Sequence, residues 1–142
     1  MIVTGAEVVS WVAERAGVSV TSRATALGWM KDKLMAGVIY DDFNGANMMT
    51  HIAGEGKRWM TREYLWTIFS YPFDLCGVKR ITATVAEGNE ASQLFVEHLG
   101  FTLEAELEDA HPTGNMLLYR MMKKDCRFLD QKRFSRLELK AA

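Results

Sequence analysis

Cysteine and proline are scarce in this sequence of 142 residues, and long apolar runs are missing. The two cysteines, Cys76 and Cys126, are too few for a disulfide scaffold and lack metal-ligand spacing. No apolar run approaches about 18 residues, the length that a membrane-spanning helix needs. The first residues also lack the basic-then-apolar order of a signal peptide. We therefore expect a cytoplasmic globular protein without a metal site or a membrane partner.

A strong excess of charge is also missing, since 17 basic and 18 acidic residues give a net charge of −1. This balance argues against a general nucleic-acid binder. The charges are nevertheless segregated along the chain. The segment 120–142 carries eight basic and three acidic residues, whereas 81–119 has no Lys or Arg and seven acidic residues: Glu87, Glu90, Glu97, Glu104, Glu106, Glu108 and Asp109. Solvated faces that happen to segregate would explain this pattern equally well.

The length and the 49% of apolar residues fit one domain with one core. We assign residues 1–122 to this domain and 123–142 to a basic C-terminal extension. The extension has enough apolar side chains to dock on its own domain, on a protein partner or on a second copy in a homodimer: Phe128, Leu129, Phe134, Leu137 and Leu139. Otherwise it is a disordered end.

Apolar periodicity and turn residues predict the elements of the first half. Thr4 followed by Glu7 has capping-box spacing and predicts a helix over about 5–16, which Gly17 ends. Strands are expected at 24–30, 34–40 and 47–53, with the last two joined through the turn signal Asn44-Gly45. Short turns between these strands predict an antiparallel meander.

The second half is predicted to alternate between helix and strand. Thr61 begins a helix that Pro72 ends, and Asn89 caps another that Gly100 ends. Phe101 would fold back on Val96 beyond that second helix. Strands are expected at about 79–86, 101–107 and 116–122, with a loop around Pro112 and Gly114. This order predicts a mixed sheet with at least one parallel pair.

A Gly-x-Gly loop, Gly54-Glu55-Gly56, follows the third predicted strand and precedes a helix. Its backbone N–H groups could hold a phosphate or pyrophosphate, aided by Lys57 and Arg58. A plain turn that needs glycine for its geometry explains the spacing equally well. The loop is not a Walker motif, because Ser or Thr does not follow Gly56-Lys57.

The strings at 81–92 (ITATVAEGNEAS) and 99–104 (LGFTLE) resemble the C-terminal half of the GNAT superfamily of acyl-CoA-dependent N-acetyltransferases. The Asn-x-x-Ser and Gly-Phe-x-x-Glu spacings resemble most the branch of ribosomal-protein N-terminal acetyltransferases. Compact acetyltransferase-like proteins encoded by bacteriophages, some of them associated with virions, also resemble this chain. The family usually has a strand and two helices before residue 24, where this chain offers one helix.

The resemblance implies an α/β fold with a mixed, mostly antiparallel sheet, a splayed parallel pair of strands and helices on both faces. Acetyl-CoA, the co-substrate, would lie in the splayed slot. His51 stands where the family's loop has Gln or Arg, and Asn89 matches the asparagine that touches the pantetheine arm. The residues expected to bind acetyl-CoA are Ile52, Ala53, Gly54, Gly56, Lys57, Arg58, Trp59, Asn89, Ser92 and Phe95.

The implied reaction is direct transfer of the acetyl group to a primary amine. Many family members use a helical tyrosine as the acid, but Phe95 stands at that place, and Ser92 matches the serine of the closest branch. His111 lies nineteen residues after Ser92, where that branch has a glutamate base, and His51 is the second candidate base. The acid-rich stretch would flank a cationic small-molecule or peptide acceptor. The alternative is a GNAT-fold binding or structural module with weak catalysis.

Overall fold

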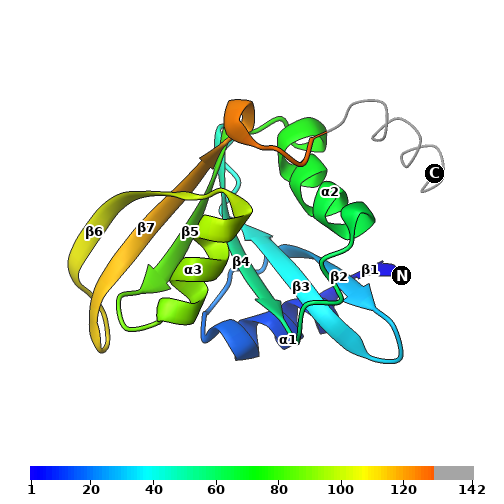
Figure 1. Ribbon diagram of the computed structural model, residues 1–142, viewed down its shortest axis with the longest axis horizontal. Helices are drawn as coiled ribbons and strands as arrows, with labels where there is room; N and C mark the ends of the chain where they lie inside the picture. Colours follow the sequence, from blue (N-terminus) through cyan, green and yellow to red (C-terminus); the bar gives the residue numbers. More distant parts are fainter. Residues whose placement is uncertain (130–142) are drawn as a thin grey trace.

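The computed structural model describes residues 1–129, and within them seven strands form one sheet (Figure 1). The strand order is β1-β2-β3-β4-β5-β7-β6, and only the β4–β5 pair is parallel. This confirms the predicted mixed sheet. The elements in chain order are β1 (Ile2–Thr4), α1 (Ala6–Ala16), β2 (Thr25–Met30), β3 (Leu34–Asp41), β4 (Asn47–Gly54), α2 (Arg62–Ser70), a π-helical turn (Tyr71–Leu75), β5 (Arg80–Ala86), α3 (Glu90–Leu99), β6 (Thr102–His111), β7 (Gly114–Met122) and a 3₁₀ turn (Lys123–Asp125).

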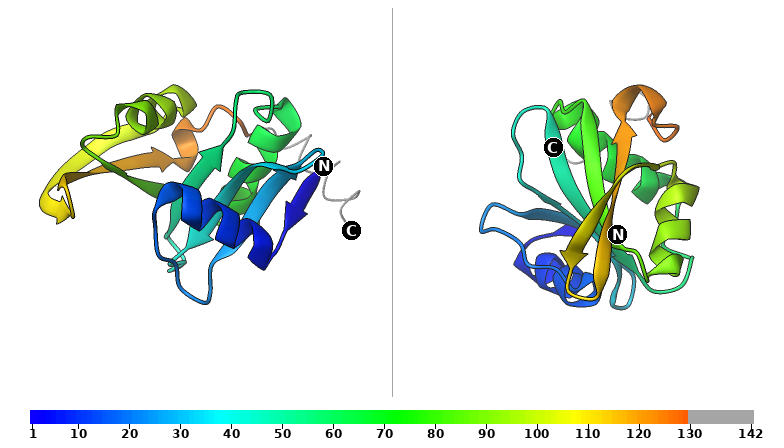
Figure 2. Two further views of the ribbon diagram at one scale, coloured as in Figure 1. Left: turned by 90° about the horizontal axis from the view of Figure 1, so that it is seen from below. Right: turned by 90° about the vertical axis from the view of Figure 1, so that its left-hand side faces the viewer.

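Helices cover both faces of the sheet, as expected (Figure 2). The larger core packs α2 and α3 against one face through side chains such as Ile68, Phe69 and Val96. The smaller core packs Val8 and Val12 of α1 against the opposite face. A side chain on Gly37 of β3 would overlap Val12, so α1 lies directly on the strand backbone. The sheet is therefore the middle layer between α1 and the α2–α3 pair.

The predicted capping box at the start of α1 is wrong. Thr4 belongs to β1, where its hydroxyl donates to the Ala26 carbonyl at 2.5 Å. Gly5 occupies the N-cap position with φ 119° and makes no side-chain cap. The strand β1, which pairs with β2, was not expected, because three residues are too few to show a period of two. The predicted end of the helix is confirmed, since Gly17 has the left-handed conformation.

Two further expectations about chain breaks need correction. The α-helix of α2 does end before Pro72, but the chain continues as a π-helical turn rather than leaving the helix. Pro72 lies at the start of that turn, and the Ile68 carbonyl, which the missing N–H leaves without a helical partner, accepts from the Tyr40 hydroxyl instead. The loop expected around Pro112 and Gly114 is also much shorter, since β6 runs to His111 and β7 begins at Gly114.

The caps of α3 follow the sequence prediction. The Asn89 side chain accepts a hydrogen bond from the Ser92 N–H at 3.1 Å. At the other end Gly100 is left-handed, and the Phe101 N–H donates to the Val96 carbonyl at 3.0 Å. The bonds at the C-terminal end form the Schellman arrangement, and the two caps together hold both ends of α3 in place.

The first residues of the C-terminal extension pack on the domain. Phe128 stacks on Phe69 of α2 with ring centroids 4.8 Å apart, and Arg127 donates to the His98 carbonyl at 2.7 Å. The predicted contacts of Phe134, Leu137 and Leu139 lie outside the described residues. Among residues 1–129, no helix is long and apolar enough to cross a membrane.

Candidate active site

The parallel strands β4 and β5 pair over only three residues each, from Asn47–Arg80 to Met49–Thr82. At the end of this joint, the Thr50 hydroxyl donates to the Thr82 carbonyl at 3.2 Å. Both strands continue beyond this point without pairing with each other (Figure 1). The result is a fork, with Thr50 at its apex, which matches the splayed pair that the resemblance implied.

A groove of about 680 Å³ lies between the two arms of the fork. Its walls are residues 50–54 of β4 and 83–86 of β5. On one face of the sheet α3 contributes Asn89, Ser92 and Phe95, and on the other the C-terminal end of α1 contributes residues 15–18. Since these two helices lie on opposite faces, the groove passes through the sheet and is reached from both sides.

The loop after β4 is held rigidly at the mouth of the groove. Glu55 donates through its N–H to the Met35 carbonyl at 2.8 Å, and its carboxylate pairs with Arg15 at 3.3 Å and Lys33 at 3.4 Å. These two hydrogen-bonded cations hold the pKa of Glu55 below its usual value. The loop is thereby fixed to α1 and to the β2–β3 turn.

Trp59 shapes the same loop from inside. Its indole is 3% exposed, donates to the Gly56 carbonyl at 2.9 Å and packs where a Cβ on Gly54 would stand. Gly56 itself has φ 70°, a conformation that favours glycine. Both loop glycines are therefore required, Gly54 for the close approach of the ring and Gly56 for its backbone angle.

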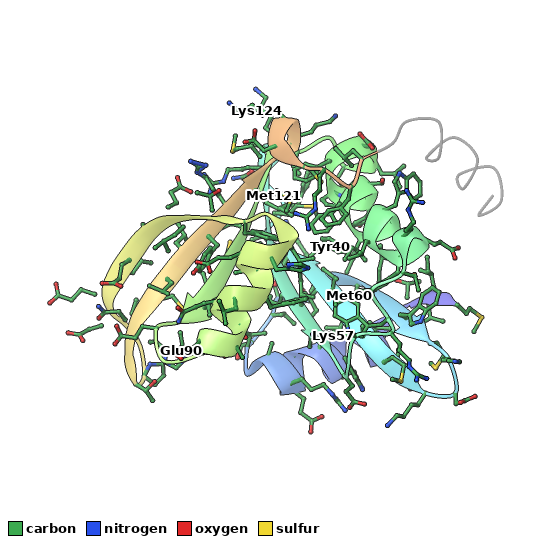
Figure 3. The ribbon with its side chains drawn as sticks, in the orientation of Figure 1. Tyr40, Lys57, Met60, Glu90, Met121 and Lys124 are labelled. Carbon is green, nitrogen blue, oxygen red and sulfur yellow. The ribbon has the colours of Figure 1, made fainter. Side chains whose placement is uncertain are left out.

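The loop leaves a run of backbone donors free. The N–H groups of residues 56–59 donate to no acceptor within the described part of the chain. They precede the N-terminal end of α2, whose dipole favours an anion. Figure 3 shows Lys57 and Met60 in this loop, beside the groove. The donor set fits a pyrophosphate, which needs N–H groups and positive charge.

Almost all the predicted site residues meet in this groove. All the candidate catalytic residues and all but one of the predicted cofactor residues line it: Ile52, Ala53, Gly54, Gly56, Lys57, Trp59, Asn89, Ser92 and Phe95, with His51 and His111. The exception is Arg58, which is exposed and does not line the groove. Asn89 caps α3 through its oxygen, and its NH₂ group donates to no described residue. The Ser92 hydroxyl likewise has no hydrogen bond within residues 1–129.

The two histidines differ in what holds them. His51 pairs across β4–β3 with Ile39, so it faces the α1 side of the sheet. Burial lowers its pKa from the usual value, while Asp41 and Asp42 act in the opposite direction. His111 lies at the hairpin turn, where its Nδ1 accepts from the Thr113 N–H at 3.2 Å and lies 2.9 Å from the Thr113 hydroxyl. In a neutral ring, this arrangement places the proton on Nε2.

Sequence reasoning missed the contribution of α1 and of the strand faces. Arg15, Gly17 and Met116 line the groove, but each lies far in sequence from the recognised motifs, and Thr84 stands inside the string 81–92 without a local signal of its own. Only tertiary contact shows them, since nothing local marks a helix end or a strand residue as groove lining. The seven acidic residues expected beside the acceptor are not among the lining residues.

No family model matches this sequence, and no curated protein matches it by sequence. Solved structures do match it. A spermidine N-acetyltransferase SpeG variant from Vibrio cholerae aligns with a TM-score of 0.65 at 14% identity, over 89% of this chain and 79% of that one. A GNAT-family acetyltransferase from Bacillus anthracis aligns with a TM-score of 0.58 at 15% identity, over 72% and 67%.

Two further solved structures also match. The N-acetyltransferase PseH from Campylobacter jejuni, solved with acetyl coenzyme A, gives a TM-score of 0.56 at 12% identity, over 72% of this chain and 70% of that one. A structure described as a candidate acetyltransferase gives 0.62 at 16% identity, and this chain spans 60% of its length. At such identities the comparisons establish the fold. The chain has the GNAT fold, a mixed sheet opened at its single parallel pair and flanked by helices on both faces.

Proposed function

We propose that this protein transfers an acetyl group from acetyl-CoA directly to a primary amine. The observation that carries the proposal is the groove that passes through the sheet, because it offers one side to each of two substrates. The α2–α3 side has the free loop amides and would hold acetyl-CoA. The α1 side has His51 and would receive the amine.

The residues on the first side are suited to a CoA thioester. The N–H groups of residues 56–59, with Lys57, would bind the pyrophosphate. The free NH₂ group of Asn89 could donate to a carbonyl of the pantetheine arm. Acetyl-CoA supplies a thioester carbon that an amine can attack. Trp59 and Phe95, whose rings meet edge to face at 5.7 Å, would form an apolar wall of the slot.

In the transfer, the amine nitrogen bonds to the thioester carbon, the carbon–sulfur bond breaks and the amine loses a proton. His51 would accept that proton, because burial favours its neutral form and its ring has no hydrogen bond within the described residues. His111 is the second candidate, although its Nδ1 is already occupied by Thr113. The free hydroxyl of Ser92 would donate a proton to the leaving sulfur.

The acceptor would be a cationic amine, as a spermidine acetyltransferase among the matching structures suggests.

The test is calorimetric titration with acetyl-CoA, followed by a thiol-release assay over peptides, polyamines and aminoglycosides. We expect binding and release with at least one amine class. The variants S92A, H51A and H111A should each bind acetyl-CoA within about threefold of the wild type, and the first two should lose about 100-fold or more in turnover. Absence of acetyl-CoA binding would overturn the cofactor site. Binding without thiol release from any amine would instead favour a binding module.

A further inference from the structure

Asp41 is an acidic residue in the interior that the proposed chemistry does not use. It ends β3, is 4% exposed and pairs with Met49 of β4. His51, two residues beyond Met49, is therefore its diagonal neighbour on the same face of the sheet. Diagonal neighbours on one face lie about 7–8 Å apart, and the negative charge of Asp41 acts to raise the pKa of His51.

The Asp41 carboxylate is held in a fixed position. One oxygen accepts from the Thr21 N–H at 2.8 Å. The other accepts from the Thr21 hydroxyl at 2.5 Å and from the Asp42 N–H at 2.9 Å. These hydrogen bonds outweigh the effect of burial and lower the pKa of Asp41. The residue is thus a negative charge whose position Thr21 and the Asp42 N–H fix.

We infer that Asp41 is a positioning residue for His51, and that its fixed charge stabilises the imidazolium formed when His51 takes the proton of the acceptor amine. The inference rests on the proposed function, in which His51 is the base. Asp42 contributes less to this arrangement, because it is exposed and follows the end of the strand. Other charged or titratable groups that line the groove with His51 are Arg15 on α1, which pairs with Glu55, Lys57 in the loop after β4 and His111 on the β6–β7 hairpin. Arg23 lines a neighbouring hollow together with Asp41.

The decisive variant is D41N, which removes the charge and nearly keeps the shape. Loss of the charge lowers the pKa of His51 further, so the acid limb of the kcat profile should move to lower pH by about half to one unit. The plateau should fall about three- to tenfold, because a weaker base accepts the proton less readily. The KM for acetyl-CoA should stay within about twofold, since the cofactor side is untouched. A residue with only a structural role would lower the rate without moving the limb.

The matched control is D42N, for which we expect less than half the shift of D41N. If D41N does not fold, T21V keeps the Asp41 charge but removes one anchor. It should move the acid limb of the kcat profile to lower pH, by less than D41N does, because the carboxylate is less firmly held and acts on His51 more weakly. An unmoved limb in T21V, or equal shifts in D41N and D42N, would overturn the inference.

An NMR titration of the His51 ring in the free protein separates this inference from the proposed function. The midpoint should fall in D41N by the same half to one unit even when no turnover is measured. An unmoved midpoint overturns the role of Asp41 while acetyl transfer stands. A midpoint that moves in a protein without any thiol release overturns the function and, with it, the catalytic role of Asp41.

Discussion

The two halves of the sheet are built differently and are joined only weakly. Strands β2–β4 form a meander of neighbouring hairpins, β1 pairs with β2 at its edge, and α1 covers one face of this half. Strands β5, β7 and β6 form the second half, with α3 on the opposite face (Figure 2). Within each half the strands pair over most of their length, whereas β4 and β5 share only three residue pairs.

This difference places the groove at the joint. A fully paired β4–β5 ladder would close the sheet and leave no passage between its faces. Because each half has its own ladders and its own helix, the short joint can stay open without loss of order. We therefore expect substitutions to lower the stability of the fold most within a half, less at the joint and least on the surface.

The largest effect is expected within the first half, from G37V. A Cβ at Gly37 already overlaps Val12, so valine would push α1 away from β3. We expect a loss of about 3 kcal/mol in the free energy of unfolding, measured by urea denaturation. The control is G88A, because no atom lies within 4 Å of a Cβ there, and it should change stability by less than about 0.5 kcal/mol. Equal stability of the two variants would show that α1 does not bind the first half tightly.

A medium effect is expected at the joint, from T50V. The variant removes the hydroxyl that donates to Thr82 at the apex of the fork, in a fully buried position. We expect a loss of about 1 kcal/mol and weaker acetyl-CoA binding, because the apex sets the width of the groove. The matched control is T67V, which removes a hydroxyl donating to Glu63 on the exposed side of α2. Should T67V cost as much as T50V, the apex has no special part in holding the halves together.

The smallest effect is expected on the surface of the second half, from E104Q. Glu104 of β6 pairs with Arg80 of β5 at 2.6 Å and with Arg120 of β7 at 3.7 Å. The hydrogen bond from Arg80 lowers the pKa of Glu104, so the ion pair stabilises the fold above pH about 4.3 and is lost as pH falls through the lowered value. The midpoint temperature should drop by less than about 2 °C at pH 7.

Thermal melts of wild type and E104Q over pH 2–7 test this sign. The difference between the two proteins should disappear at low pH, where the glutamate is protonated. A difference that persists at pH 2 would mean that the side chain acts through packing rather than charge.

Most of the local structure could be predicted from the sequence because its signals are local. The cap at Asn89, the left-handed Gly100 and the turn at Asn44 each act within a few residues. Prediction from local signals fails at Thr4. The Thr4–Glu7 spacing is typical of a capping box, but it is also compatible with Thr4 as the last residue of a strand. The hydrogen bond to Ala26, 22 residues away, decides between them.

The site divides in the same way. Gly54, Gly56, Asn89 and Ser92 stand in recognisable strings, so the sequence alone identified them and the groove contains them all. The part played by Arg15 depends on an ion pair with Glu55 across 40 residues, which no local pattern carries.

The sequence by itself determined the mixed sheet, the glycine loop and the helix that Asn89 begins, because backbone preference and apolar period act over one or two turns. Only the tertiary structure decided how far β4 and β5 pair, and hence that a passage exists at all. It also brought Asp41 beside His51, because strand register depends on the whole ladder and not on either strand alone.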